Sequence, residues 1–143
     1  MKSVLRLLSM LGITAGLCVP AVVRAEETLV PIYFGVRFIC NTETQVEEYV
    51  GFLKLGQDGE RARVSVNGIH GNSVCGEAAI TYVYRETVKS IPVPEQAGAV
   101  EIHKLLILVA TDLATGETTR ATEVLYQYAP IWVNTDGVES DDI

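Results

Sequence analysis

Residues 41–56 read NTETQVEEYVGFLKLG, and this stretch decides the fold more than any other part of the chain. Its apolar residues recur at i, i+3, i+4 and i+7, the spacing that places side chains on one face of an α-helix. They are Val46, Tyr49, Val50 and Leu53. The stretch therefore predicts an amphipathic helix whose apolar face is covered by the rest of the domain.

Both ends of this helix are also marked in the sequence. Thr42 and Gln45 have the spacing of a capping box, in which each side chain bonds the backbone N–H of the other residue. Glu43 in the first turn and Lys54 in the last turn complement the helix dipole. Gly56 is suited to end the helix. These signals all indicate the same boundaries.

The segments beside the helix are predicted less uniformly. Leu29 to Ile39 is rich in β-branched and aromatic residues, which indicates a strand, and Pro31 and Gly35 within it indicate an edge or bulged strand. Residues 60–67 (ERARVSVN) are typical of either a short second helix or a strand, and we favour the helix slightly. Residues 68–75 (GIHGNSVC) contain two glycines, an asparagine and a serine, and predict a loop.

From residue 76 onward the sequence predicts β-structure almost throughout. Residues 78–84 and 87–93 are strand-like. Residues 99–110 begin with an alternating pattern and become continuously apolar, which is typical of a central strand covered on both faces. Residues 118–127 are expected to return as its hairpin partner after a turn near Gly116.

Residues 1–25 have the pattern of a cleavable export signal. Lys2 and Arg6 form a basic start, residues 7–23 are almost wholly apolar, and small or modest residues precede a cleavage point after Ala25. A signal of this kind predicts an exported protein, either periplasmic or secreted.

Two other interpretations of this leader have less support. A retained anchor needs about 20 apolar residues, but polar residues and a proline interrupt this short run. A lipoprotein needs a small residue before the cysteine, but Leu17 precedes Cys18. We therefore expect no stable membrane span after signal cleavage.

Two cysteines remain after cleavage, Cys40 and Cys75, with 34 residues between them. In an oxidising compartment, an even pair without metal-type spacing is most simply a disulfide. Such a bridge should stabilise the domain by roughly 3 to 4 kcal/mol. We therefore predict an α+β fold, in which one or two helices pack on an antiparallel β meander in a single small disulfide-bonded domain.

The charge of the chain excludes some classes of partner. The sequence has 11 Lys and Arg against 18 Asp and Glu, a formal charge of −7. The leader carries three of the basic residues and no acidic one, so the remaining 118 residues carry −10. Nucleic acids and anionic membranes select clusters of Lys and Arg, so we expect no nucleic-acid partner. We place one domain at residues 26–133 and a disordered acidic tail at residues 134–143.

Four sequence elements resemble a family of small exported bacterial proteins of unknown function. They are CNTETQVEEYV, VSVN, VCGEAAITYV and KLLILVATD. They match a Cys-x-Thr-x-x-Gln-Val-Glu entry, a Val-Asn pair before a loop, and a second Cys-Gly before a strand. The resemblance covers about Ile39 to Asp112. It implies a shared disulfide-pinned domain and no particular activity.

Candidate binding residues fall in two groups. His70 and Asn72 lie in the predicted loop, where His70 could act as a pH-sensitive contact or general base, or could be an ordinary solvated residue. Tyr126, Tyr128 and Trp132 form an aromatic cluster that either completes the core or contacts a partner. We favour core packing for the aromatic cluster.

The patterns of common catalytic and metal sites are missing from the sequence. His70 and His103 are far apart, and no further ligands have zinc-site spacing. Ser73 in GNSVCG is the serine nearest to a nucleophile motif, but the flanking residues of that motif are missing. We therefore predict no catalytic residue, no metal site and no cofactor, and we lean against an enzyme.

Three functions remain open at this stage. The favoured one is an exported non-enzymatic domain that binds a protein or an envelope component. An alternative is a small-ligand-binding periplasmic protein with a pocket between helix and sheet. A less favoured one is a small hydrolase that uses the loop at residues 68–76. The oligomeric state is open.

Overall fold

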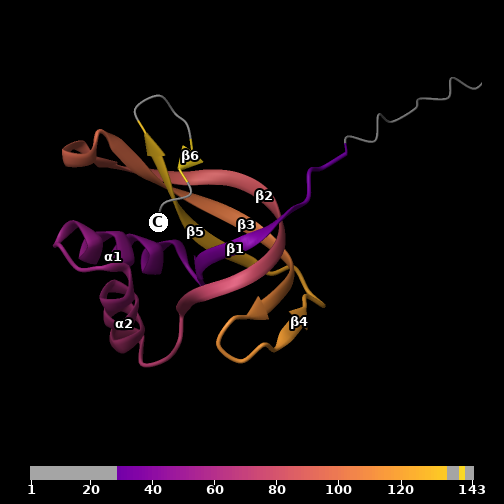
Figure 1. Ribbon diagram of the computed structural model, residues 1–143. Helices are drawn as coiled ribbons and strands as arrows, with labels where there is room; N and C mark the ends of the chain where they lie inside the picture. Colours follow the sequence, from indigo (N-terminus) through magenta and orange to yellow (C-terminus); the bar gives the residue numbers. More distant parts are fainter. Residues whose placement is uncertain (1–28, 135–138, 141–143) are drawn as a thin grey trace, which may run out of the picture.

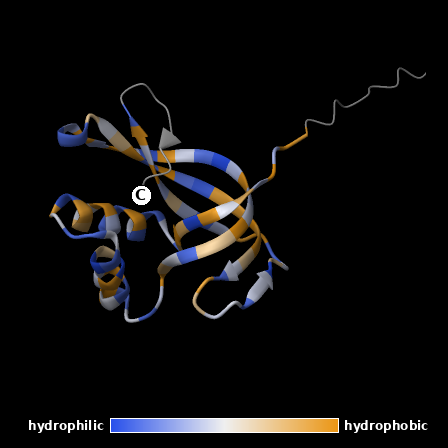
Figure 2. Cartoon of the chain, viewed as in Figure 1, coloured by the Kyte–Doolittle hydropathy of each residue, from blue (hydrophilic) through white to orange (hydrophobic). Residues whose placement is uncertain are grey.

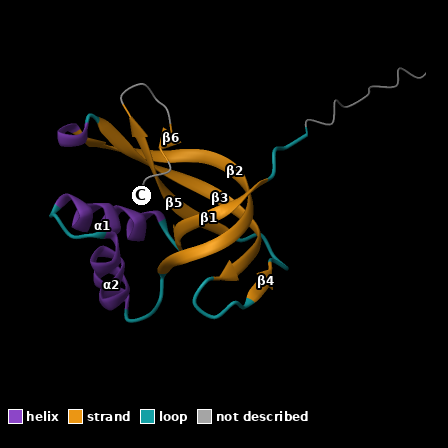
Figure 3. Ribbon diagram, in the orientation of Figure 1, coloured by secondary structure: helices purple, strands orange, loops and turns teal. Residues whose placement is uncertain are grey.

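A strongly curved antiparallel sheet and two short α-helices make up the described part of the chain in this computed structural model, residues 29–134 and 139–140 (Figures 1 and 3). The elements are, in order, β1 (Tyr33–Cys40), α1 (Glu43–Lys54), α2 (Gly59–His70), β2 (Cys75–Val93), the 3₁₀ turn η1 (Pro94–Gln96), β3 (Gly98–Asp112), β4 (Thr118–Arg120), β5 (Tyr126–Asn134) and β6 (Glu139–Ser140). The predicted α+β fold is confirmed. The predicted export signal lies outside the described residues.

Within the described sheet, β3 pairs with β2, β4 and β5. The strand order is β4-β3-β2-β1-β5-β6, and β3 also pairs with β5. One edge of β3 pairs along its length with β2, while its other edge pairs first with β5 and then with β4. Register shifts in the β2–β3 ladder mark bulges, which bend strands and increase their twist. Because β5 also reaches β1, the strands β1, β2, β3 and β5 close into a ring.

The helix α1 forms as its local sequence predicts. Thr42 Oγ1 accepts a hydrogen bond from the Gln45 N–H at 3.3 Å, and Gln45 Oε1 accepts one from the Thr42 N–H at 3.0 Å. Both bonds of the predicted capping box are therefore present. Val46, Tyr49 and Val50 on the predicted apolar face are buried.

The second helix is confirmed, but the loop predicted at residues 68–75 is wrong over its first part. Asp58 caps α2 by accepting a hydrogen bond from the Arg61 N–H at 2.8 Å. The helix continues through Gly68 to His70 and is capped by Gly71, whose φ of 71° is the left-handed conformation that glycine adopts without strain. Within the predicted loop at residues 68–75, only residues 71–74 lie outside helices and strands.

The predicted hairpin partner of β3 also differs in position. Residues 118–127 do not form one strand, because β4 ends at Arg120 and the chain crosses to the other part of the β3 edge before β5 begins. The predicted strands at residues 78–84 and 87–93 are parts of one long strand, β2. Most of the predicted disordered tail, residues 134–143, lies outside the described residues. Within it, Glu139–Ser140 pairs with β5 as β6.

Two apolar cores occupy the two faces of the curved sheet. The first joins both helices and the disulfide to the ends of β2 and β3. The second joins side chains from β2, β3 and β5. Its fully buried members include Ile80 and Ile107. The sheet therefore buries residues on both faces, which explains the continuously apolar run in β3.

Candidate functional site

The disulfide between Cys40 and Cys75 is present, as predicted. The two cysteines are register partners at the ends of β1 and β2, with their Cα atoms 4.1 Å apart, and both are buried. The bridge closes the part of the chain that contains both helices. It therefore holds the helical segment against the sheet, which is a structural role.

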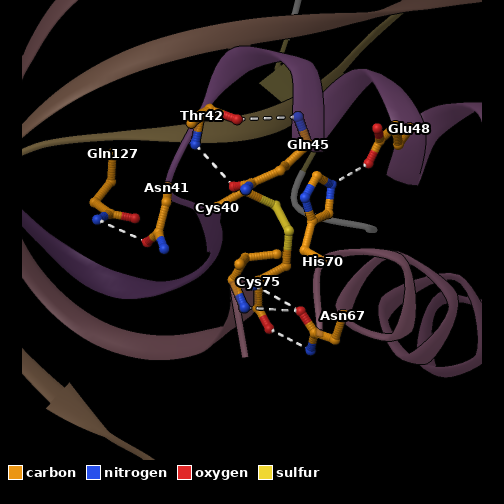
Figure 4. Close-up of a disulfide and its surroundings, with 10 residues drawn as sticks. Cys40, Asn41, Thr42, Gln45, Glu48, Asn67, His70, Cys75 and Gln127 are labelled. Atoms are coloured by element: carbon orange, nitrogen blue, oxygen red, sulfur yellow. Dashed lines mark hydrogen bonds and ion pairs between the residues drawn. A yellow bond between two sulfur atoms is a disulfide. The ribbon is translucent and has the colours of Figure 1, made fainter. Parts of the chain in front are cut away.

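The side chain of Asn67 supports this junction, and the sequence analysis did not single it out. Its Oδ1 accepts hydrogen bonds from the Val74 N–H at 3.0 Å and the Cys75 N–H at 2.9 Å (Figure 4). Its Nδ2 donates to the Cys75 carbonyl oxygen at 3.0 Å. An asparagine amide can replace a peptide group in this way, so one side chain links α2 to the start of β2.

His70 lies at the end of α2 and has a partner on α1. Its Nε2 is 2.6 Å from Glu48 Oε2, and both side chains are partly exposed (Figure 4). Asn72 lies in the following turn, where its backbone carbonyl accepts a hydrogen bond from the Val74 N–H at 3.0 Å. His70 therefore joins the two helices. Whether either residue binds a partner stays a prediction.

The aromatic residues Tyr126, Tyr128 and Trp132 alternate along β5 and so share one face of that strand. Tyr128 and Trp132 pack against the core beneath the helices. The Tyr126 ring lies 4.5 Å from Lys104 Nζ, within cation–π range. All three side chains are half-buried, so they contribute to packing while part of each ring still reaches the surface.

One of these aromatic residues, Trp132, lines a cleft of about 850 Å³ between α1 and the tip of the β2–β3 hairpin. Figure 1 shows the hairpin tip and α1 on the same side of the sheet. The lining residues are Tyr49, Val50, Leu53, Lys54, Gln57, Gly59, Val93, Glu95, Gln96, Val100 and Trp132. The cleft therefore combines apolar side chains from α1, β2, β3 and β5 with polar ones from the end of α1 and from η1.

Two close contacts shape the cleft. A Cβ atom at Gly98 would lie 2.5 Å from the Val133 carbonyl oxygen and 2.8 Å from Trp132 Cζ2, so only glycine lets the indole lie this close to β3. The Tyr49 ring stacks on Phe38 with its centroid 4.2 Å away. Trp132 and Tyr49, which both line the cleft, are therefore each held by a close packing contact.

The Tyr49 phenol is neutral across the physiological pH range. Its burial and, to a smaller extent, the negative charge of Glu77 raise the pKa of the phenol above its ordinary value. A neutral hydroxyl can donate or accept a hydrogen bond. Tyr49, which lines the cleft and is 4% exposed, thus brings no charge to it.

Metal-ligand clusters and membrane-spanning helices were sought in the described part of the chain. Within residues 29–134 and 139–140, no group of three or more His, Cys, Asp or Glu side chains is arranged to hold a metal ion. Neither described helix has the length and hydropathy needed to cross a bilayer. Each helix has only 12 residues.

Comparisons of the chain with protein-family models, with curated proteins and with solved structures found no match. The resemblance to small exported bacterial proteins therefore stays a prediction. The function has to be argued from the cleft and the surfaces of the molecule.

Proposed function

We propose that this protein is an exported, non-enzymatic binding domain whose cleft accepts an apolar group of a protein or another envelope component. The cleft beside Trp132 carries this proposal. Its volume of about 850 Å³ lies in the range of about 300 to 1,000 Å³ found for ligand sites. Tryptophan is also one of the residues enriched among those that contribute most to the binding energy of protein interfaces.

The composition of the cleft favours an uncharged group with a polar edge. Val93, Val100 and Leu53 supply apolar surface, whereas Lys54 and Glu95 bring opposite charges to the lining. An apolar side chain or acyl group could replace water on the floor, and a neighbouring amide or hydroxyl could bond the polar residues. Desolvation of the apolar floor would drive such binding.

Export supports an envelope component as the partner. The leader pattern at residues 1–25 directs the chain out of the cytoplasm, and buried disulfides such as Cys40–Cys75 form in oxidising compartments. The negative formal charge disfavours nucleic acids and anionic lipid surfaces. A protein or a neutral envelope component is therefore the class of partner we favour.

The test is capture of partners from an envelope extract by immobilised protein, with a pair of leucine variants. Leu53→Glu places a charge inside the cleft, whereas Leu55→Glu changes an exposed leucine two residues away that does not line it. We expect wild type and Leu55→Glu to recover the same component and Leu53→Glu to lose it. Equal recovery by both variants, or no component recovered by wild type, would contradict the proposal.

The second candidate, a small-ligand-binding periplasmic protein, uses the same cleft. Trp132 is the only tryptophan in the sequence, so its fluorescence reports directly on the cleft. A small-molecule fraction of the periplasm that shifts this fluorescence and raises the melting temperature in wild type, but not in Leu53→Glu, would favour this candidate. A response only to protein fractions would favour the first candidate.

A further inference from the structure

Six exposed apolar side chains lie within eight consecutive residues at the start of the described chain. Figure 2 colours hydrophobic residues of the chain orange. They are Leu29, Val30, Ile32, Tyr33, Phe34 and Val36. Leu29 is 89% exposed and Phe34 is 79% exposed. Monomeric proteins rarely expose a continuous apolar patch of more than a few hundred Å². This segment therefore has the character of an interface.

The backbone of β1 has an open edge in the same place. On one side β1 pairs with β2 without a break, from Tyr33 opposite Tyr82 to Cys40 opposite Cys75. On its other side, the described chain pairs only Cys40, with Tyr128 of β5. An edge of this length presents backbone hydrogen-bonding groups to another chain.

The ladder geometry shows which residues direct their backbone groups to the open edge. The Asn41 N–H donates to the Val74 carbonyl, and the neighbouring Cys40–Cys75 pair has the short Cα distance of 4.1 Å, typical of an antiparallel pair without mutual hydrogen bonds. Bonded and non-bonded pairs alternate, so the even-numbered residues of β1 point their N–H and C=O groups away from β2. Phe34 and Val36 therefore offer these groups to a new strand.

The usual protection of an edge strand is missing from residues 32–36. Native edges are shielded by charged side chains, bulges, proline or short length. This segment reads IYFGV, with no charged residue, and its register with β2 has no shift. Two copies of the segment can therefore meet without repulsion between like charges, although the chain as a whole is acidic.

We propose that a second copy of this chain covers the edge, with the two β1 strands antiparallel about a two-fold axis at Gly35. In this register Phe34 lies opposite the partner's Val36, and the partner's Phe34 lies opposite Val36. These two pairs exchange backbone hydrogen bonds, and aromatic side chains beside β-branched ones are favourable cross-strand neighbours. In this dimer Phe34 of each copy thus covers Val36 of the other copy.

The size of the contact indicates a reversible dimer. An aromatic side chain buries roughly 150 to 250 Å² when fully covered, so Phe34, together with Ile32, Tyr33 and Val36, supplies a few hundred Å² per copy. Stable interfaces bury about 800 Å² per partner. The proposed contact is smaller than this, so we expect the dimer to dissociate at low protein concentration. No residue of β1 lines the cleft beside Trp132, so this inference goes beyond the proposed function and does not depend on it.

The first experiment is sedimentation equilibrium of the protein purified from the periplasm of an expressing bacterium, over a wide range of concentration. We expect the mass to rise to twice that of one chain. Val36→Lys should halve the measured mass at the same protein concentration, because it places one positive charge from each copy beside the two-fold axis, where the two charges repel. The matched control is Val64→Lys on α2, since Val64 is 55% exposed and Val36 is 56% exposed. This control should remain dimeric.

The second experiment tests the register without weakening the strand. Gly35 would face its own symmetry mate as a non-bonded pair, and a side chain there meets no atom within 4 Å in one copy. Under mild oxidation Gly35→Cys should form a covalent dimer, whereas Val36→Cys, one residue further from the axis, should not. The proposal is overturned if the wild type stays monomeric at all concentrations. It is also overturned if a different protein, and not a second copy, covers the open edge of β1. A covalent dimer formed by Val36→Cys and not by Gly35→Cys overturns it as well.

Discussion

The Cys40–Cys75 disulfide should supply a large share of the free energy of unfolding. The bridge joins residues 35 positions apart, for which loop-closure entropy corresponds to about 4 kcal/mol. Replacing both cysteines by alanine also removes two buried sulfur atoms, each leaving a small cavity that costs about 1 kcal/mol. We therefore expect Cys40→Ala/Cys75→Ala to lose about 5 to 6 kcal/mol in total. Small domains are stable by only about 5 to 15 kcal/mol, so the variant should be close to unfolding.

The assay is urea unfolding at room temperature, followed by circular dichroism and by the fluorescence of Trp132. Reduced wild-type protein is the matched control, because it loses the covalent bond but keeps both sulfur atoms. It should lose about 4 kcal/mol, and the alanine variant should lose the further cavity term. If reduction changes the free energy of unfolding by less than about 1 kcal/mol, the entropic argument is refuted, because the two ends must then already be close in the unfolded chain.

Three further predictions concern single residues. Asn67→Ala leaves the Cys75 N–H without its acceptor, while the Val74 N–H keeps the Asn72 carbonyl, and should cost about 1 to 3 kcal/mol in urea unfolding, whereas Asn72→Ala should stay within about 0.5 kcal/mol of wild type. Gly98→Ala should cost about 1 to 3 kcal/mol and shift the tryptophan emission, because its methyl group would lie 2.5 Å from a carbonyl oxygen of β5; Gly76→Ala, where the methyl group meets nothing, is the control. The raised pKa of Tyr49 means that the folded protein favours the neutral phenol. The neutral phenol therefore contributes fully to the free energy of unfolding below about pH 10, and this contribution is lost as pH rises through the folded-state pKa. The free energy of unfolding should therefore fall less for Tyr49→Phe than for wild type between neutral and strongly alkaline pH. Equal falls would contradict a raised pKa for Tyr49.

Local signals predicted α1 correctly, because the forces that define its ends act over three or four residues. The capping box at Thr42 and Gln45 forms with both hydrogen bonds. The disulfide was predictable for a different reason, since the predicted cleavage of the leader would leave only two cysteines and hence one possible pairing. These features need no knowledge of the rest of the molecule.

The sequence predictions were wrong where contacts with residues distant in the sequence determine where a helix or strand ends. Two glycines suggested a loop from residue 68, but α2 continues past Gly68 to a left-handed glycine, Gly71. The bonds between Asn67 and the start of β2 support this longer helix. The strand predicted at residues 118–127 is divided for a similar reason, because β3 offers separate parts of its edge to β4 and β5.

The sequence by itself determined the class of fold, the helix α1, the disulfide and the acidic charge, together with an expectation of export. Only the tertiary structure placed Trp132 beside α1 and the β2–β3 tip, joined His70 to Glu48, and left β1 open along one edge. Helix periodicity and capping depend on residues a few positions apart. The cleft and the open edge depend on which strands pair across the sheet, and that choice is made by the burial of many side chains at once.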